Sequence, residues 1–595
     1  MSEHSRSRCH RWLNTILLTI NDPMVYDLTR LAVNLHKKQI RGHTYWYARE
    51  CQRVDGKPKI VWQKYLGRAE DVANAVGVPS KPPAPREVVL TDFAAPAALY
   101  DLIKQLDLIA IIDRHSGKRA QGIGVGTYIA LAALNRCVAP TSKAGMAEWY
   151  GSTVLRRLLP VPVNLLTSQR FWDHMSYLDA DKIAAIEQHL TRCLIDQFQI
   201  EMSCLLYDTT NFYTFIDSFN EAPSLPQRGK SKEKRTDLRI VGLALLVTKD
   251  FHIPVFHQVY AGNIHDSTGF ASVTETLVAR FRLFSQNVDE ITVVYDKGNN
   301  SADNQAFLDA SPYHFVGSLS PSQHPDLVRI RKSRFRALEG DDLQGVLAYR
   351  TRKNVLGADR LIVVTYNPEL FLAQSTTILR EIRKRLGKLK ELQAQLAHPP
   401  AKGKRPTIES VQKRAHEILS GRHMKDLIVV TVALQDGRPR LHYRVDQSAW
   451  NRLQNTLLGK NILFTDQESW SDEDIVRAYR GQFHVEDAFK TMKNPHCVSW
   501  RPLGHWTDQK IRVHAFYCVL ALLLSSLLRR TLAQKQIHLS IPKMFSELSQ
   551  VKEVALFYRG PNSHTKPVIS YSQMSPLQQQ LIQALDLQRF QTNAD

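Results

Sequence analysis

Cysteine is scarce in this chain, which has seven cysteines in 595 residues. They are scattered, and no two of them form a CxxC pair. That spacing argues against a zinc ribbon and against a framework of disulfide bonds. The absence of a paired-cysteine pattern is typical of proteins in a reducing compartment, so we expect a cytoplasmic protein.

The chain also lacks an uninterrupted hydrophobic run long enough to cross a membrane. Its longest run, residues 513–528, contains His514, Ser525 and Ser526, whereas a span needs about 20 apolar residues. We interpret this run as part of a buried helix, from about 509 to 529. The short run at 13–20 is interrupted by polar residues and has no clear cleavage site, so we expect neither a signal peptide nor a membrane partner.

Acidic residues are outnumbered by basic ones. Lysine and arginine (78) exceed aspartate and glutamate (57) by 78 − 57 = 21. A chain this basic is expected to bind a polyanion, with nucleic acid the first candidate and an anionic membrane surface the weaker one. Its 595 residues are too many for one hydrophobic core, so several domains are expected.

The pattern of apolar residues predicts an α/β protein. A β-hairpin at 43–66 turns at Asp55-Gly56, and residues 95–200 have helical periodicity. From Ser203 the pattern changes to short apolar runs, at 204–207, 240–248, 251–260, 291–295 and 314–319, with one helix at about 272–283. Three antiparallel strands followed by a helix and further strands indicate a mixed sheet with helices.

These patterns divide the chain into several parts. They are a basic segment with the hairpin (1–88), a helical region expected to bind DNA (89–200), the first part of the α/β core (201–320), an insertion of strands and a helical hairpin (321–460), the second part of the core (461–535) and a C-terminal tail (536–595). The arms of the helical hairpin carry a basic group: Arg383, Lys384, Arg385, Lys388, Lys390, Lys413 and Arg414. Two interpretations of this group stay open, a solvated charged face and a contact with the DNA backbone.

The segment from Ser471 to Lys493 predicts one helix with two unlike faces. Ser471 suits the N-cap, and three acidic residues follow it in the first turn, where the helix dipole favours them. Residues three and four apart share a face, which collects Tyr479, Gln482, Glu486, Lys490 and Lys493. The apolar side collects Val485, Ala488, Phe489 and Met492. An ordinary amphipathic helix has the same pattern, but lysines can also bind phosphates while the carboxylate binds a metal ion.

Two acidic residues upstream stand directly after predicted strands. Asp208 follows the run 204–207 and Asp296 follows the run 291–295. Each alone could be an ordinary turn residue, with Asp208 opening an Asx-turn. Together with Glu486, in so basic a protein, they favour a shared site, provided that the first and fourth strands are neighbours and the helix packs across them.

Converging carboxylates repel each other unless a cation joins them. Oxygen-only ligands suit Mg²⁺ or Mn²⁺ better than Zn²⁺. Two such ions, roughly 3.5–4 Å apart, can support the hydrolysis or transfer of a phosphodiester. The three carboxylates therefore predict a site of metal-dependent phosphodiester chemistry.

Several motifs carry a resemblance to a known family. The signature positions are Tyr479, Gln482, Glu486 and Lys493. Other segments are Asn135-Arg-Cys-Val-Ala-Pro-Thr-Ser-Lys, Asp208-Thr-Thr-Asn-Phe-Tyr, Gly262-Asn-Ile-His-Asp, Tyr295-Asp-Lys-Gly and Ile511-Arg-Val-His-Ala-Phe. As an ordered set they resemble bacterial insertion-sequence transposases of the DDE class, in the group with a YREK signature and a large insertion before the catalytic glutamate. Gln482 stands where that group has arginine.

This resemblance implies a ribonuclease-H-like catalytic core and a DNA transposase. It implies that Asp208, Asp296 and Glu486 are the catalytic, metal-binding residues, with Mg²⁺ or Mn²⁺ as the ions. The enzyme would cut double-stranded DNA at the terminal inverted repeats of its element and join the 3′-hydroxyl to target DNA, as a dimer at the bacterial nucleoid. Two alternatives stay open: a ribonuclease-H-like nuclease or resolvase that cuts without joining, and a non-catalytic DNA-binding repressor.

Further DNA contacts are expected around the triad. The resemblance implies that Tyr479 and Lys493 touch DNA near the cleaved phosphate, and we add Gln482 and Lys490 from the same helix face. The loop after the first strand carries a basic group, with a solvated loop as the alternative: Lys230, Lys232, Lys234 and Arg235. Arg512 and His514 are expected to make structural polar contacts in the buried helix.

Overall fold

A computed structural model describes residues 33–54, 56–72, 85–217, 219–229, 237–264, 291–398, 405–558 and 567–591. The chain forms two compact units, one of residues 1–89 with 555–568 and one of residues 90–554 with 569–595. Two predictions lie outside the described residues. They are the helix at 272–283 and the DNA contacts of Lys230, Lys232, Lys234 and Arg235.

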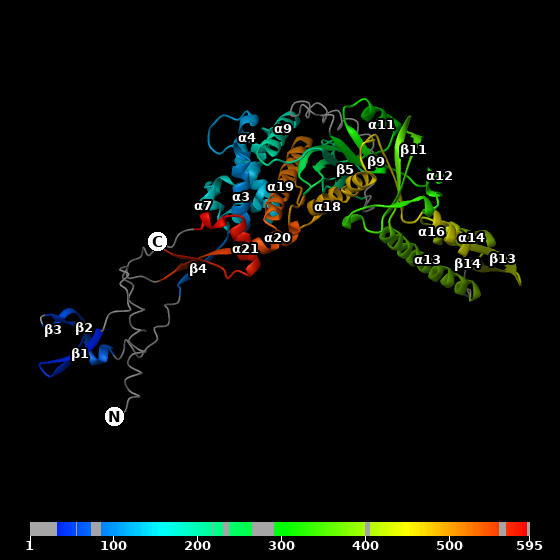
Figure 1. Ribbon diagram of the computed structural model, residues 1–595. Helices are drawn as coiled ribbons and strands as arrows, with labels where there is room; N and C mark the ends of the chain where they lie inside the picture. Colours follow the sequence, from blue (N-terminus) through cyan, green and yellow to red (C-terminus); the bar gives the residue numbers. More distant parts are fainter. Residues whose placement is uncertain are drawn as a thin grey trace. The chain divides into compact units, whose positions relative to one another are not determined.

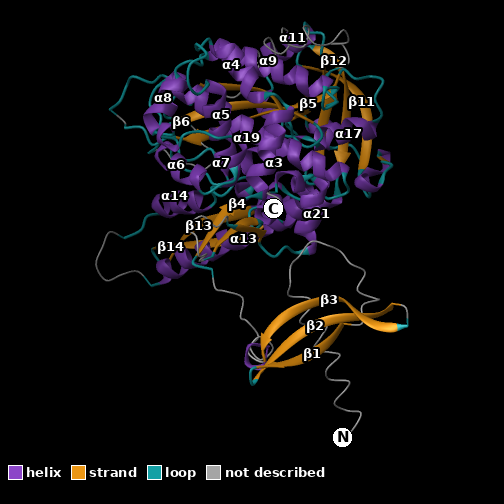
Figure 2. Cartoon of the chain, turned by 90° about the vertical axis from the view of Figure 1, so that its left-hand side faces the viewer, coloured by secondary structure: helices purple, strands orange, loops and turns teal. Residues whose placement is uncertain are grey.

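In the first unit, three strands form the antiparallel sheet β1-β2-β3 (Figure 2). They are β1 Val33–Ile40, β2 His43–Val54 and β3 Lys57–Arg68. The predicted hairpin is confirmed as β2 and β3. Gly56, in the turn between them, has a φ of +76°, a left-handed conformation that glycine adopts without steric strain.

The second unit is built on a mixed sheet, whose described strands run in the order β10-β11-β12-β15-β9-β8-β5-β6-β7. The strands predicted from the apolar runs are β5 Cys204–Tyr213, β6 Ile240–Thr248, β7 Pro254–Ala261, β8 Thr292–Tyr295 and β9 His314–Leu319. β5, β6 and β7 are antiparallel, whereas β8 and β9 run parallel to β5. The mixed sheet is confirmed, with β5 and β8 as neighbours, which is the condition for Asp208 and Asp296 to share a site.

The sheet continues into the region that we predicted as an insertion. β10 (Arg336–Ala337), β11 (Leu347–Val355) and β12 (Ala358–Tyr366) follow α11 (Ala302–Asp309) and α12 (Pro325–Val328), and β15 (Lys460–Thr465) joins β12 to β9. β11, β12 and β15 extend the core because their apolar side chains are buried in the main hydrophobic cluster. The part of 321–460 with a hydrophobic cluster of its own therefore begins later, near α13.

That smaller insertion contains the predicted helical hairpin. Its elements are α13 Pro368–Ala397, α14 Ile408–Ile418, α15 Met424–Leu427, β13 Ile428–Gln435, β14 Arg438–Val445 and α16 Gln447–Thr456. Leu389, Leu427 and Trp450 are buried in its core. Of the basic group on α13, Arg383, Lys384, Lys388 and Lys390 are exposed, while Arg385 is half-buried and pairs with Glu381.

The predicted helical region is confirmed. It contains α3 Ala94–Gln105, α4 Leu108–Ser116, α5 Val125–Val138, α6 Met146–Gly151, α7 Leu155–Leu158, α8 Ser168–Met175 and α9 Ala180–Asp196. The long helix α19 (Asp508–Gln534) packs against α3, α5, α9 and β7 (Figure 1). By length and composition α19 could cross a membrane, but 94% of its most apolar stretch is buried within the protein. The helical region and the sheet thus share one hydrophobic core.

The residues after α19 are folded, although we expected a tail there. Their elements are α20 Ile541–Leu548, β16 Lys552–Phe557, β17 Val568–Tyr571 and α21 Pro576–Ala584. β16 lies between β17 and β4 (Glu87–Asp92) in a small sheet. α20 packs on α19 and α3, which buries Met544 and Leu548 in the main core.

The segment that we predicted as one continuous helix is two helices, α17 (Asp472–Arg480) and α18 (Gln482–Lys493). They meet at Gly481, so the prediction of one uninterrupted helix is wrong there. A Cβ atom on Gly481 would lie 3.3 Å from Leu206 Cδ2, and glycine therefore lets this junction approach β5 closely. The predicted apolar side of the helix is confirmed, because all four of its members are buried: Val485, Ala488, Phe489 and Met492.

Candidate active site

Three polar side chains stand in a row across the adjacent parallel strands β5, β8 and β9. The register pairs Tyr207 of β5 with Tyr295 of β8. Asp208 and Asp296 come next and therefore stand at the same level. The register of β8 with β9, continued by two residues, sets Ser318 on the other side of Asp296. Neighbouring strands lie about 4.8 Å apart and side chains at one level project from the same face, so the two carboxylates are brought side by side.

The Asp296 carboxylate is held by two hydroxyl groups. Ser318 Oγ donates a hydrogen bond to Asp296 Oδ1 at 3.0 Å, and Tyr479 Oη donates to the same oxygen at 3.1 Å. The backbone N–H of Lys297 donates to Ser318 Oγ at 3.2 Å. Ser318 is a site residue that sequence reasoning missed. Its apolar strand was visible, but nothing local in the sequence reveals which residue of that strand stands beside Asp296.

Asp208 lies within β5 and is half-buried. The backbone N–H of Thr209 donates to its Oδ1 at 2.7 Å. The strand continues to Tyr213 and pairs with β6 along this whole stretch. The alternative of an Asx-turn at Asp208 is therefore wrong, because the residue is part of a paired strand.

The helix α18 lies alongside β5 (Figure 1). The Gln482 side chain, 9% exposed, donates from Nε2 to the carbonyl oxygen of Tyr207 at 3.4 Å. The Gln482 side chain thus joins α18 to β5 at Tyr207, the residue before Asp208. Glu486, one turn further along α18, is exposed.

The Tyr479 hydroxyl is protonated at neutral pH. Burial raises the pKa of the Tyr479 hydroxyl, and the negative charges of Asp296 and Glu486 raise this pKa further. Because the pKa is above its ordinary value, the hydroxyl keeps its proton and remains a hydrogen-bond donor to Asp296 at neutral pH.

Two lysines follow Glu486 on α18, and both are exposed. Lys490 Nζ lies 4.9 Å from the centre of the Phe483 ring, and Lys493 Nζ lies 5.6 Å from that of Phe212. Such cation–π contacts hold a lysine side chain near the surface without removing its charge from solvent. This face of α18 is therefore basic, as predicted, whereas Gln482 of the same predicted set is buried.

The carboxylates supply only oxygen ligands. Among the residues that the structure describes, no group of three or more His, Cys, Asp or Glu side chains is gathered closely enough to hold a metal ion. Two of the predicted ligands, Asp208 and Asp296, are nevertheless side by side through the strand register. Paired carboxylates with Glu486 nearby fit a hard divalent cation such as Mg²⁺ or Mn²⁺.

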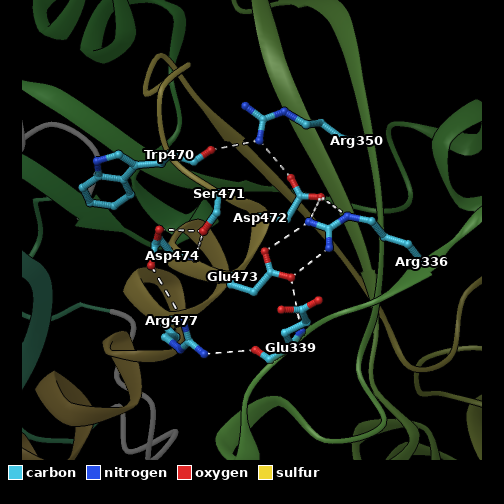
Figure 3. Close-up of polar contacts among 9 residues, drawn as sticks. All are labelled: Arg336, Glu339, Arg350, Trp470, Ser471, Asp472, Glu473, Asp474 and Arg477. Carbon is cyan, nitrogen blue, oxygen red and sulfur yellow. Dashed lines mark hydrogen bonds and ion pairs between the residues drawn. The ribbon is translucent and has the colours of Figure 1, made fainter.

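A network of ion pairs fixes the start of α17 (Figure 3). Asp472, 2% exposed, accepts hydrogen bonds from Arg336 Nη2 at 2.9 Å and from Arg350 Nη1 at 3.0 Å. Arg336 Nη1 also pairs with Glu473 at 2.8 Å and lowers the pKa of that carboxyl to about 2. Ser471 caps the helix by accepting from the Asp474 N–H at 3.1 Å, as predicted. The edge strands β10 and β11 thereby hold the helix that carries Tyr479.

The segment after α18 is held by the helical region and α19. The Trp500 N–H donates to the Met492 carbonyl oxygen at 2.8 Å, and His514 Nε2 donates to the Trp500 carbonyl oxygen at 2.7 Å. Arg136, 1% exposed, donates to the carbonyl oxygen of Arg501. The structural role predicted for His514 is confirmed. The motif around Arg136 therefore holds the segment that follows α18 in place.

Comparisons with known proteins identify the family of the chain. Residues 202–524, more than half of the chain, match the sequence model of a family described as transposase DDE domain. No curated protein matches the chain. The solved structure of a piggyBac transposase synaptic complex with hairpin DNA is similar with a TM-score of 0.35 and 10% sequence identity, over 78% of this chain and 82% of that one. A TM-score this low leaves the family match as the basis for assignment.

Proposed function

This chain belongs to the DDE transposase family and is a DNA transposase, and from that premise we propose that Asp208, Asp296 and Glu486 are its catalytic residues. The observation that carries this proposal is the register of β5 with β8, which sets the two aspartates side by side. The packing of α18 along β5 supports the inclusion of Glu486. All three residues lie within the matched stretch 202–524.

DDE transposases use divalent metal ions, and the three carboxylates would hold them in this chain. We propose two ions, Mg²⁺ or Mn²⁺, because the donor set is all oxygen. When bound, such ions stabilise the negative charge that develops on the phosphate during phosphodiester cleavage. The protein's own part is to keep the carboxylates oriented, which the hydroxyls of Tyr479 and Ser318 do at Asp296.

We propose that the DNA strand to be cut lies along α18. The exposed ammonium groups of Lys490 and Lys493 would bind backbone phosphates on either side of the cleaved bond. Gln482 is buried, and we propose that it holds α18 on β5, where the YREK group has an arginine. The basic loop at Lys230, Lys232, Lys234 and Arg235 would add phosphate contacts.

We further propose that the substrates are the terminal inverted repeats of a bacterial insertion sequence and a target duplex. Two ends must be held together for joining, so a dimer would assemble on the DNA, at the nucleoid. The exposed lysines and arginine of α13 suit backbone contacts in that assembly. The strands β1–β3 and the helical region would then read the end sequence.

A strand-transfer assay tests this function. The full-length protein is incubated with Mg²⁺, a labelled duplex that ends in the repeat flanking its gene, and a supercoiled target plasmid. We expect a nick that exposes the 3′-hydroxyl, followed by joined products. Cleavage without joining would favour the nuclease or resolvase alternative, and binding without cleavage would favour the repressor.

Replacing Tyr479 by phenylalanine is expected to slow cleavage by about tenfold, because one hydrogen bond to a charged group contributes about 1.5 kcal/mol. The hydroxyl keeps its proton in the wild-type protein, so the pH profiles of the two proteins should have the same shape below pH 10. Single-turnover cleavage rates between pH 6 and 9 check this. Tyr177→Phe, in the helical region, is the control, and an unchanged rate for Tyr479→Phe would contradict the orienting role.

A further inference from the structure

Ser318 occupies a position that neither the motifs nor the family match singled out. It is the third member of the row formed with Asp208 and Asp296, and it is 3% exposed. Its hydroxyl is placed between two groups of the same turn, because it accepts from the Lys297 N–H and donates to Asp296 Oδ1. Its carbonyl oxygen accepts from Asn300 Nδ2 at 2.7 Å. The hydroxyl and the carbonyl oxygen of Ser318 thus both form hydrogen bonds with the segment 296–300.

The direction of these hydrogen bonds determines which oxygen of the Asp296 carboxylate is free of hydrogen-bond donors. A serine hydroxyl has one proton. The Asp296 carboxylate can only accept, so Ser318 donates this proton to it, while the Ser318 oxygen accepts from the Lys297 N–H. The Tyr479 hydroxyl donates to the same oxygen, Oδ1. Within the described part of the chain, no donor contacts Oδ2 of Asp296. One carboxylate oxygen is occupied and the other is left available.

We propose that Ser318 is a positioning residue, which holds Asp296 so that Oδ2 is presented to the divalent cation beside Asp208. This inference rests on the proposed metal-binding role of Asp296. Groups that hydrogen-bond to a ligating carboxylate fix its orientation, and their loss typically weakens metal binding by about 10- to 100-fold. Ser318 therefore sets metal affinity without touching DNA or the metal itself.

An alternative explanation is that Ser318 only satisfies buried polar groups, as most buried hydroxyls do. The two explanations differ in what they predict. A purely structural serine affects the thermal stability of the protein when it is replaced, but it leaves metal affinity unchanged in the fraction that is folded. A positioning serine changes metal affinity in the folded protein.

The test compares Mn²⁺ binding by the full-length protein, followed by the electron paramagnetic resonance signal of free Mn²⁺, with the Mg²⁺ concentration that gives half-maximal cleavage. For Ser318→Ala we expect both Mn²⁺ affinity and Mg²⁺ requirement to worsen by about tenfold, with DNA binding unchanged. Ser318→Thr keeps the hydroxyl and should restore both. Ser320→Ala, two residues along the same strand end, is the matched control and should behave as wild type.

Two comparisons make the outcome decisive. In the Asp296→Asn background, Ser318→Ala should cause no further loss of Mn²⁺ affinity, because residues that act through one another are not additive. Combined with Tyr479→Phe, Ser318→Ala should be worse than either change alone. Wild-type Mn²⁺ affinity in a folded Ser318→Ala protein overturns the positioning role alone. Wild-type Mn²⁺ affinity in Asp296→Asn overturns the proposed metal site and the role of Ser318 with it.

Discussion

Asp208→Asn and Asp296→Asn are each expected to reduce DNA cleavage by about 10³-fold or more, which corresponds to about 4 kcal/mol of lost transition-state stabilisation. Asparagine has nearly the same shape as aspartate but carries no charge, so it cannot balance a divalent cation. The two residues stand side by side on β5 and β8, and the loss of either should disable the same site. Glu486→Gln should have a comparable effect.

Cleavage of a labelled end in Mg²⁺ measures these losses, and a gel-shift assay measures DNA binding, which we expect to persist because phosphate contacts come from basic residues. Asp487→Asn is the matched control. Asp487 adjoins Glu486 but projects about 100° around the helix, so its charge is not directed at the same point. If all three triad variants keep Mg²⁺-dependent cleavage, the triad is misassigned.

Asp472→Asn is expected to destabilise the protein by about 2–3 kcal/mol, below the 3–5 kcal/mol typical of a broken buried pair. The Asp472 side chain is 2% exposed and pairs with Arg336 and Arg350, whose side chains are 52% and 35% exposed. Removing the charge leaves two arginines without their buried partner, although both can turn toward water. Because α17 carries Tyr479, cleavage should fall as well.

Thermal unfolding of the full-length protein, followed by calorimetry, should show the transition of the second unit shifted down by several degrees. Asp474→Asn is the control from the same helical turn. Asp474 is 57% exposed and lies 3.8 Å from Arg477, and such surface pairs contribute only about 0–1 kcal/mol. Equal transition temperatures for Asp472→Asn and Asp474→Asn would show that the network does not hold α17.

Sequence reasoning located much of the site because its signals were local. The apolar runs at 204–207 and 291–295 identified two buried strands. Asp296 directly follows its strand, as predicted, whereas the prediction that Asp208 ends its strand is wrong, because β5 continues to Tyr213. The spacing of Val485, Phe489 and Met492 identified the buried side of α18. A run of buried side chains appears in the sequence as a pattern of a few neighbouring apolar residues, and this pattern can be recognised without knowledge of the fold.

Other parts of the site depended on pairings that no local pattern contains. Gln482 belongs by spacing to the polar face of its helix, yet it is buried because Gly481 lets that end of α18 approach β5. Ser318 looks like any small residue in an apolar strand until the register of β8 with β9 is known. The predicted insertion was too long because β11 and β12 pair, through β15, with the core.

The sequence by itself determined the strands, the two aspartates beside their apolar runs, the amphipathic helix with Glu486 and, through the ordered motifs, the family. The tertiary structure alone decided that Asp208, Asp296 and Ser318 stand in one row and that Arg336 and Arg350 hold α17. It also decided that the core sheet continues into the region predicted as an insertion. The physical reason is how far apart along the chain the interacting residues lie. Burial and helix periodicity are set by residues close together in the chain. Strand register and ion pairing join residues that are farther apart, from the 22 positions between Asp296 and Ser318 to the 136 between Arg336 and Asp472.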